Sequence, residues 1–259
     1  MQIPIFQVDA FTNKLFSGNP AAVCPLDNWL PDTQLQAIAA ENNLAETAFF
    51  IKDNGGYHLR WFTPTVEVDL CGHATLASAF VILTRLTPSE QSVRFESKSG
   101  ELIVTREGDK FTLDFPSRTP TECHPHPQLA TALGGVPEAI LAARDYLVVY
   151  GSEDELRALK PDMEQLKATD RFAVSATAPS NNFDYVFRFF APAQGIPEDP
   201  ATGSAHCTLI PYWSNRLGKT GLHAFQLSPR GGEFWCEDCG PRVRISGEVV
   251  CFLEGTISL

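Results

Sequence analysis

Two short stretches of the chain contain residues that could hold an anion and move a proton. The longer one is Glu198-Asp-Pro-Ala-Thr-Gly-Ser-Ala-His206, and the shorter one is Cys71-Gly-His-Ala-Thr75. In each, a glycine opens a largely apolar, alanine-rich segment, which is typical of the start of a helix. A helix start presents backbone N–H groups without intrahelical partners and the positive end of the helix dipole. Each stretch is therefore suited to binding an anion.

The two stretches belong to an internal repeat. Arg60-Trp-Phe-Thr-Pro64 aligns with Arg188-Phe-Phe-Ala-Pro192, and after a short insertion in the second copy Gly72-His-Ala74 aligns with Gly203-Ser-Ala205. Each copy predicts a strand that ends in proline, a loop, and a helix that begins at the glycine. Two such copies predict two related halves with a ligand site built between them.

Glu46 interrupts the otherwise apolar run Leu44–Ile51. A carboxylate there either points to solvent where a strand begins, or lies in a cleft where it can act as a general acid or base. His73 begins a mostly apolar helix beside Gly72, and it is either structural or catalytic. The residue pattern alone leaves both questions open.

Three other patterns are weaker candidates for a functional site. Asn19 in the turn Gly18-Asn-Pro20 either contacts a ligand or only shapes the turn. His124 and His126 could be half of a metal site, but no acidic or cysteine ligand lies at a useful spacing. Cys236-Glu-Asp-Cys239 could be half of a zinc site or a redox pair, yet the flanking strands favour a hairpin turn. We therefore expect neither a metal nor an organic cofactor.

Composition limits the classes of partner. The chain has 259 residues, of which 44% are hydrophobic and 20% charged, and its net charge is −11. This charge disfavours nucleic acid or an anionic membrane as the main partner. No stretch is apolar enough to span a membrane, and no signal peptide is recognisable. Seven scattered cysteines fit reduced cytosolic thiols. The sequence predicts a cytoplasmic protein that binds a small anionic metabolite, with a homodimer as a candidate assembly.

The elements around the first stretch predict an α+β fold. The segment after Gly72 is apolar on nearly all sides, which indicates a buried helix. Strands are predicted before it, at Tyr57–Phe62, and after it, from Val93–Glu96 onward. A mixed sheet wrapped around a central helix is the architecture expected from this order.

The division into halves is expected in the proline-rich linker that follows Phe115. The first half would span 1–117 and the second 118–251, with a final strand around 252–259 expected to return to the first half. In the second half we predict a helix from Ser204 that ends near Gly218 and is kinked or restarted at Pro211.

Five motifs together resemble the PhzF family of phenazine-biosynthesis-like domain proteins. They follow the family's order along the whole chain: Gly18-Asn-Pro-Ala-Ala-Val, Asn43-Leu-Ala-Glu-Thr-Ala-Phe49, Arg60-Trp-Phe-Thr-Pro, Leu70-Cys-Gly-His-Ala-Thr75 and Glu198-Asp-Pro-Ala-Thr-Gly-Ser-Ala-His206. The resemblance implies a diaminopimelate-epimerase-like fold, with two pseudo-symmetric halves and the active site in the cleft between them. It also implies isomerisation by proton transfer without a cofactor.

The same resemblance implies roles for individual residues. Glu46 falls on the position of the catalytic carboxylate, and the supporting polar positions fall on His73, Asp199 and Ser204. The leading hypothesis is an isomerase that moves a proton between carbon atoms of a small carboxylate-bearing substrate. His73 and Asp199 would act with Glu46 in catalysis, while the expected substrate-binding residues are Asn19, Gly72, Thr202, Gly203 and Ser204.

Two alternatives remain open at this point. One is an epimerase or racemase that acts at a single carbon. Members of the superfold with this activity use two opposed cysteines, and Cys71 lies near the first of these positions, but the second copy of the repeat has no cysteine. A racemase with two thiols is therefore disfavoured. The other alternative is a binding or regulatory module that keeps the fold without catalysis.

Overall fold

The computed structural model describes residues 1–259, which form two compact units. The first unit comprises Met1–Asp114 and Ser246–Leu259, and the second comprises Phe115–Ile245. The sequence-based expectation placed the division between 117 and 118 and the returning strand near 252. Each unit is described by itself below.

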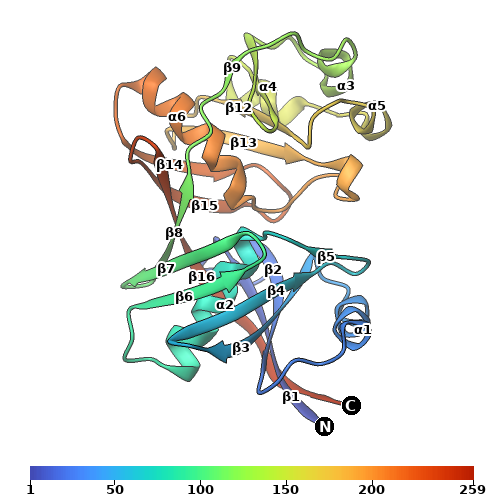
Figure 1. Cartoon of the computed structure of the whole chain (residues 1–259). Coiled ribbons are helices and arrows are strands. Elements are labelled where there is room, and N and C mark those ends of the chain that lie inside the picture. Colours follow the sequence, from blue (N-terminus) through green and yellow to red (C-terminus); the bar gives the residue numbers. More distant parts are fainter. The chain divides into compact units, whose positions relative to one another are not determined.

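The first unit is a mixed sheet that closes on itself (Figure 1). Its strand order is β1-β2-β3-β4-β6-β7-β8-β16, and β16 also pairs with β1. The short strand β5 pairs with β4. The strands are β1 (Gln2–Ala10), β2 (Asn19–Leu26), β3 (Glu46–Asp53), β4 (Gly56–Phe62), β5 (Glu67–Val68), β6 (Ser92–Ser97), β7 (Gly100–Glu107), β8 (Lys110–Pro116) and β16 (Arg242–Ser258), whose second part belongs to this unit.

Helix α2 (Gly72–Val81) is the central helix of the first unit. It contacts β1, β2, β3 and β7, and every residue of it except Phe80 is buried. The helix then widens into a π-helical turn, Ile82–Leu86. A helix buried on almost all sides requires the nearly continuous apolar sequence found here. The predicted architecture of a sheet around a central helix is confirmed for this unit.

Helix α1 (Asp32–Asn42) packs against β3 and β4. It buries the three apolar residues Leu35, Ile38 and Ala39. These side chains join an apolar cluster with Phe49 and Phe62. The helix therefore fixes the strand pair that begins with Glu46.

The second unit has the strand order β16-β15-β14-β13-β12-β11-β10-β9. Its strands are β9 (Thr121–Glu122), β10 (Ala139–Ala142), β11 (Tyr146–Val149), β12 (Val174–Ala178), β13 (Tyr185–Phe190), β14 (Gly221–Gln226), β15 (Gly232–Asp238) and the first part of β16. Its helices are α3 (Leu129–Leu133), α4 (Glu153–Ala158), α5 (Met163–Lys167) and α6 (His206–Leu217), with short 3₁₀ turns at Pro192–Gln194 and Gly203–Ala205.

The two units repeat one order of strand pairing. In the first, β1–β2 is antiparallel, β2–β3 parallel, β3–β4 antiparallel, β4–β6 parallel and β6–β7 antiparallel. In the second, the same alternation runs from β10 to β15. The long apolar helix follows the fourth strand of each series, as α2 after β4 and α6 after β13. The repeat seen in short motifs thus extends to the topology of each unit.

The second central helix differs from its prediction. Gly203–Ala205 forms a 3₁₀ turn, so α6 begins at His206 rather than at Ser204. The helix runs without a restart through Pro211 to Leu217 and is capped by Gly218 in the left-handed conformation. Proline cannot donate to the carbonyl four residues before it. That carbonyl, on Cys207, instead accepts from the backbone N–H of Arg118 at 2.8 Å, which explains how the helix tolerates the proline.

The Cys236-x-x-Cys239 motif is a hairpin turn, as the flanking strands predicted. Cys236 is buried in β15, whereas Cys239 is exposed in the turn, where its N–H donates to Arg242 O at 3.0 Å. Neither cysteine is part of a disulfide bond.

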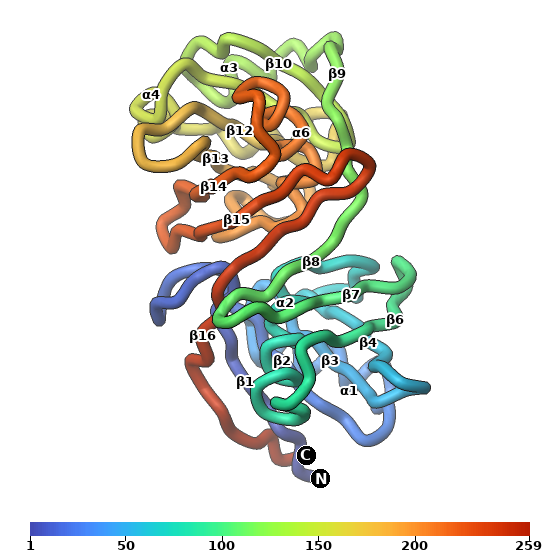
Figure 2. The backbone as a smooth tube through the Cα atoms, turned by 90° about the vertical axis from the view of Figure 1, so that its left-hand side faces the viewer, coloured from blue at the N-terminus to red at the C-terminus, as the bar shows by residue number.

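Both ends of the chain lie side by side in the first unit (Figure 2). Gln2 to Ala10 of β1 pair antiparallel with Ser258 to Val249 of β16, and Leu259 N donates to Met1 O at 2.9 Å. None of the helices combines the length and the apolar character needed to cross a membrane.

Candidate functional site

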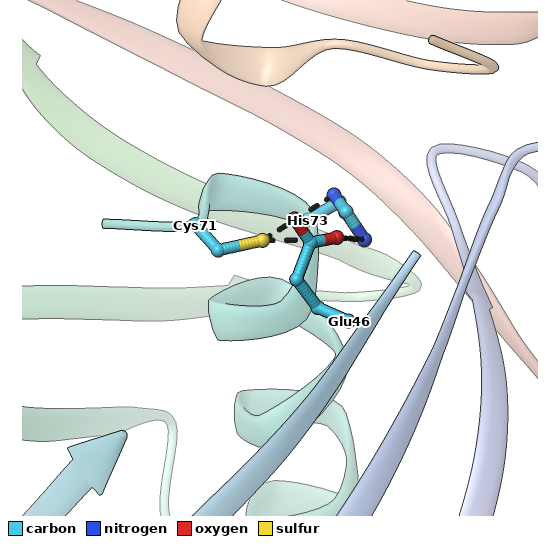
Figure 3. Close-up of side chains that lie close together, drawn as sticks. All are labelled: Glu46, Cys71 and His73. Atoms are coloured by element: carbon cyan, nitrogen blue, oxygen red, sulfur yellow. Dashed lines mark hydrogen bonds and ion pairs between the residues drawn. The ribbon is translucent and has the colours of Figure 1, made fainter. Parts of the chain in front are cut away.

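Glu46, Cys71 and His73 form a buried cluster in the first unit (Figure 3). His73 Nε2 lies 3.0 Å from Glu46 Oε2, and His73 Nδ1 lies 3.5 Å from Cys71 Sγ. The contact with Glu46 is an ion pair rather than an aligned hydrogen bond. Glu46 and His73 are each 7% exposed and Cys71 is 6% exposed. Of the two interpretations of Glu46, the structure shows the buried one.

The position of Glu46 is set by the end of α1 and the start of β3. Asn43 ends α1 in the left-handed conformation, which asparagine adopts more readily than most residues. The Asn42 side chain then donates to Thr47 Oγ1 at 3.1 Å and ties the end of the helix to the strand. Glu46 is the first residue of β3 and pairs with Ala21 of the parallel strand β2. The pairing with Ala21 and the tie from Asn42 to the neighbouring Thr47 therefore fix the position of its backbone.

His73 and Cys71 are placed by the start of α2. Cys71 precedes the helix in an extended conformation, and its carbonyl accepts from Thr75 N at 3.1 Å and from Thr75 Oγ1 at 2.6 Å. His73 is the second residue of the helix. The positive end of the helix dipole favours negative charge here, and the Glu46 carboxylate supplies it.

The cluster perturbs the pKa values of its own members. Burial raises the pKa of the Cys71 thiol to about 11, and the nearby Glu46 adds to this, so the thiol keeps its proton near neutral pH. Burial by itself lowers the pKa of His73, but Cys71 and Glu46 outweigh it and raise that pKa well above the usual value. The ion pair with Glu46 and the contact with Cys71 together favour the imidazolium form of His73.

In the second unit, Asp199 and Thr202 form the centre of the other motif. Thr202 Oγ1 donates to Asp199 Oδ2 in a short hydrogen bond, and both residues are buried. Gln226, at the end of β14, is fully buried and fastens this loop. Its Nε2 donates to Asp199 O at 2.5 Å, and its Oε1 accepts from Thr202 N at 2.6 Å. The loop is thus held by a side chain that the sequence did not single out.

Close packing also fixes the loop from the side of β15. A Cβ on Gly232 would lie 2.5 Å from the Cβ of Ala201, so only glycine allows the strand to approach the loop. Gly203 is buried and Ser204 is half-buried in the 3₁₀ turn that leads into α6. These two expected substrate-binding residues therefore stand at a short turn in front of the helix.

An arginine–glutamate pair braces each motif. Arg60 donates to both carboxylate oxygens of Glu67, and Arg188 does the same with Glu198. Arg60 aligns with Arg188 in the repeat. Neither pair was predicted, although the alignment of the glycines also places Glu67 on Glu198, and that correspondence was the signal that could have revealed them.

Asn19 is fully buried as the first residue of β2, but it is not a member of the Glu46–Cys71–His73 cluster. The turn before it has a structural cause: Gly18 has φ +66°, and a Cβ there would lie 2.2 Å from Ala10 O. The glycine is therefore explained by the backbone, while a role for Asn19 in binding stays a prediction.

One group of three side chains has the types and spacing of metal ligands, and it is the same cluster. One ligand atom each from Glu46, Cys71 and His73 lie within 4.8 Å of one another. His124, His126 and Cys236 do not belong to such a group. Cys71 as a partner of His73 was not foreseen from the sequence, where it was considered only as a candidate thiol base.

Comparison with known proteins is consistent with this architecture. A solved structure of a PhzF-family phenazine biosynthesis protein from Enterococcus faecalis matches with a TM-score of 0.98 and 45% identity, covering 100% of both chains. A predicted epimerase from Pseudomonas aeruginosa matches with a TM-score of 0.74 at 19% identity, covering 99% of each chain. The second match shows the fold alone, and it confirms the expected α+β, epimerase-like class.

The family is established by two further findings. A curated Pseudomonas aeruginosa protein described as an uncharacterised isomerase is 52% identical over 259 residues, covering 100% of both chains. The family model described as phenazine biosynthesis-like protein matches residues 8–255. The chain therefore belongs to the PhzC-PhzF family of phenazine biosynthesis-like proteins.

Proposed function

We propose that the protein is a cofactor-independent isomerase that moves a proton between carbon atoms of a small carboxylate-bearing metabolite. Its curated relative in Pseudomonas aeruginosa bears the name isomerase. The observation that carries the proposal is the buried carboxylate of Glu46, whose ion-pair partner is His73. A carboxylate in the apolar run of β3 has little structural purpose, whereas a general acid or base needs this shielding.

In the proposed mechanism, Glu46 takes a proton from one carbon of the substrate and returns it to another. A positioned acid or base of this kind typically accelerates a reaction by about 10²–10⁴-fold. His73, protonated because its pKa is raised, donates to the oxygen on which negative charge develops and so stabilises the enol-like intermediate. Proton transfer within one molecule is balanced without an oxidant or reductant.

The substrate carboxylate would be bound by backbone N–H groups at the helix starts. In the proposal, Gly72 and the amide of Asn19 bind the carboxylate in the first unit, and the N–H groups of Thr202, Gly203 and Ser204 are proposed as an anion-binding turn within the second unit. A helix end stabilises an anion by about 0.3–1 kcal/mol, and by up to about 2 kcal/mol where it is partly buried. Asp199 is proposed to relay protons, since its carboxylate already accepts a hydrogen bond from Thr202.

An epimerase acting at one carbon is the second candidate, because Cys71 lies 3.5 Å from His73 Nδ1. Against it, the thiol is held in its protonated form, and the aligned position in the other unit is Thr202. Loss of chirality without a shift of a double bond would identify this activity. Survival of that activity in Cys71→Ser would exclude the thiol as the base.

The test is a metabolite screen in deuterated water. Small carboxylic acids are incubated with the protein, and mass spectrometry and NMR follow deuterium incorporation and product formation. We expect turnover with the native protein and with Glu41→Gln, which alters an exposed glutamate on α1. Glu46→Gln should lose at least about 90% of the activity, given the size of general acid–base effects.

If Glu46→Gln keeps more than about 10% of the native activity, Glu46 is not the general acid or base of the reaction. A protein that turns over no metabolite, and whose cellular function is unchanged by Glu46→Gln, is instead a binding or regulatory module. The proposed reaction requires no metal, so activity should persist after treatment with a chelator. If the chelator removes one zinc ion per chain and the activity is lost with it, the proposal that the reaction requires no metal is wrong.

A further inference from the structure

The Glu46–Cys71–His73 cluster contains more than proton transfer requires. It brings a carboxylate oxygen, a thiol sulfur and an imidazole nitrogen within 4.8 Å of one another. These are the three ligand types that proteins use for zinc, and three protein ligands with one open position is the arrangement of catalytic zinc sites. Proton transfer by Glu46 and His73 gives no reason for the sulfur to be there.

We propose that Glu46, Cys71 and His73 form a binding site for a soft divalent cation of the zinc class, and that the cation inhibits the enzyme. The metal would bind Glu46 Oε2, His73 Nε2 and Cys71 Sγ. Binding releases two protons to the solvent, the thiol proton of Cys71 and the Nε2 proton of the imidazolium of His73, and only these S–H and N–H bonds are broken.

Two of the three ligand separations are close to those of a tetrahedral site. Usual zinc bond lengths give a sulfur-to-nitrogen separation of about 3.5 Å and a nitrogen-to-oxygen separation of about 3.3 Å in a tetrahedron. In the cluster, Cys71 Sγ is 4.0 Å from His73 Nε2, and His73 Nε2 is 3.0 Å from Glu46 Oε2. Shifts of about half an ångström in the side chains satisfy both values.

The three ligands are held by rigid backbone. Glu46 opens β3, and Cys71 and His73 lie at the start of α2, which contacts β3 directly. Each of the three is at least nine-tenths buried. A site that is already assembled loses little conformational freedom when the metal binds.

The donor set selects among metals. A thiolate and an imidazole favour zinc and related soft or borderline ions, whereas magnesium and calcium require mainly oxygen ligands. Calcium also takes six to eight oxygen ligands, more than this cluster could offer. The site should therefore discriminate against the common hard cations.

Inhibition rests on the proposed function, whereas metal binding does not. A carboxylate bound to zinc has its lone pairs engaged and cannot accept a proton from a carbon atom. His73 bound through Nε2 can no longer donate from that nitrogen. Zinc and substrate turnover would therefore exclude one another at the same three side chains.

Binding is tested without any substrate. Protein freed of metal by a chelator is titrated with Zn²⁺ in competition with a chromophoric chelator, and its metal content is measured after dialysis. We expect about one zinc per chain, with affinity lowered more than tenfold in Cys71→Ser and in His73→Gln, because loss of even outer-shell partners costs about 10–100-fold. Cys251→Ser, which alters a half-buried thiol in the same unit, should bind like the native protein.

A spectroscopic measurement reports directly whether the thiolate is a ligand, and its result for the native protein does not depend on how any variant folds. Co²⁺ bound to a thiolate gives a sulfur-to-metal charge-transfer band in the near ultraviolet, and this band should be present in native protein and in Cys251→Ser but absent from Cys71→Ser. Native protein that binds no zinc, or zinc binding that survives Cys71→Ser and His73→Gln unchanged, overturns the proposal. Because turnover is not involved, failure here leaves the isomerase proposal standing, and failure of the isomerase screen leaves this one standing.

Discussion

Arg60 holds Glu67 by two parallel hydrogen bonds, from Nε to Oε1 at 2.8 Å and from Nη2 to Oε2 at 3.0 Å. Arg188 holds Glu198 with the same two distances and the same atoms. Each guanidinium also lies over a phenylalanine ring two residues further along its strand, Phe62 at 5.1 Å and Phe190 at 5.0 Å. Both copies of the repeat therefore contain the same arginine–glutamate pair. In each copy this pair joins the strand to the segment that precedes the central helix.

Glu67→Gln should destabilise the first unit at neutral pH. Its hydrogen bonds with Arg60 lower the pKa of Glu67 to about 2. A lowered folded-state pKa means that the stabilisation is present above the unfolded value of 4.5 and is lost as the pH falls toward about 2. We expect a loss of about 1–3 kcal/mol in the free energy of unfolding near pH 7, measured by urea denaturation, and a smaller difference near pH 3.

The matched control for Glu67 is Glu101→Gln, which removes an exposed ion pair with Arg94. Exposed pairs contribute at most about 1 kcal/mol, so this variant should denature at nearly the native midpoint. If the two substitutions lower the free energy of unfolding equally, the Arg60–Glu67 pair stabilises the protein no more than an exposed ion pair does.

His73→Gln should have an effect on stability that weakens as the pH rises. Because the folded-state pKa of His73 is raised, its contribution is fully present below the unfolded value of 6.5 and is lost as the pH rises through the folded-state value. Removing one partner of a buried ion pair costs up to about 3–5 kcal/mol. Unfolding measured at about pH 6 and about pH 9 should show the larger loss at the lower pH.

A double-mutant cycle separates the ion pair from other effects of the His73 substitution. If His73 and Glu46 interact as described, the double variant Glu46→Gln/His73→Gln is more stable than the sum of the single effects predicts. If the losses in the free energy of unfolding from the two single substitutions simply add at both pH values, Glu46 and His73 do not interact as an ion pair.

Gln226→Met should loosen the loop that carries Asp199. The substitution preserves the size of a fully buried side chain but leaves the carbonyl of Asp199 and the N–H of Thr202 without their partners. Each unsatisfied group costs about 1–3 kcal/mol. Hydrogen exchange should show faster exchange in the segment 199–204, whereas Gln194→Met, at an exposed position, should leave it unchanged.

His206 should make the protein sensitive to acid. Burial lowers the pKa of this fully buried imidazole to about 3. A lowered folded-state pKa means that stability is fully present above the unfolded value of 6.5 and is lost as the pH falls toward about 3. Between about pH 6.5 and pH 4.5 the loss is on the order of 2–3 kcal/mol.

His206→Gln should remove most of this pH dependence, measured as the change in the free energy of unfolding across that interval. His124→Gln, at an exposed position in the same unit, should keep it. A native protein whose stability is flat across the interval would show that the imidazole is not held neutral.

The elements that the sequence predicted well are those with a strong local pattern. The apolar segment after Gly72 indicated α2 because burial on all sides leaves no place for polar residues. The repeat placed both central helices and the class of the fold. Ser204 misled the prediction of a helix boundary because a 3₁₀ turn and an α-helix begin with the same residue types.

The parts of the site that escaped prediction depend on contacts between distant segments. Gln226 is far from Asp199 in sequence, and nothing in the residues around it marks an amide that will be buried. Cys71 lies two residues from His73, but only the geometry at the start of a helix turns its sulfur toward the imidazole. The tolerance of α6 for Pro211 likewise depends on Arg118, which donates from outside the helix.

The pairing of β1 with residues 249–258 of β16 sets the order in which the chain can mature on the ribosome. All residues of the second unit, 115–245, are synthesised before the strand that closes the first unit exists. Until then the nascent first unit has β1 and β8 as open edges, which are the sites where a sheet pairs with foreign strands. The unit that is translated first is therefore the one that is completed last.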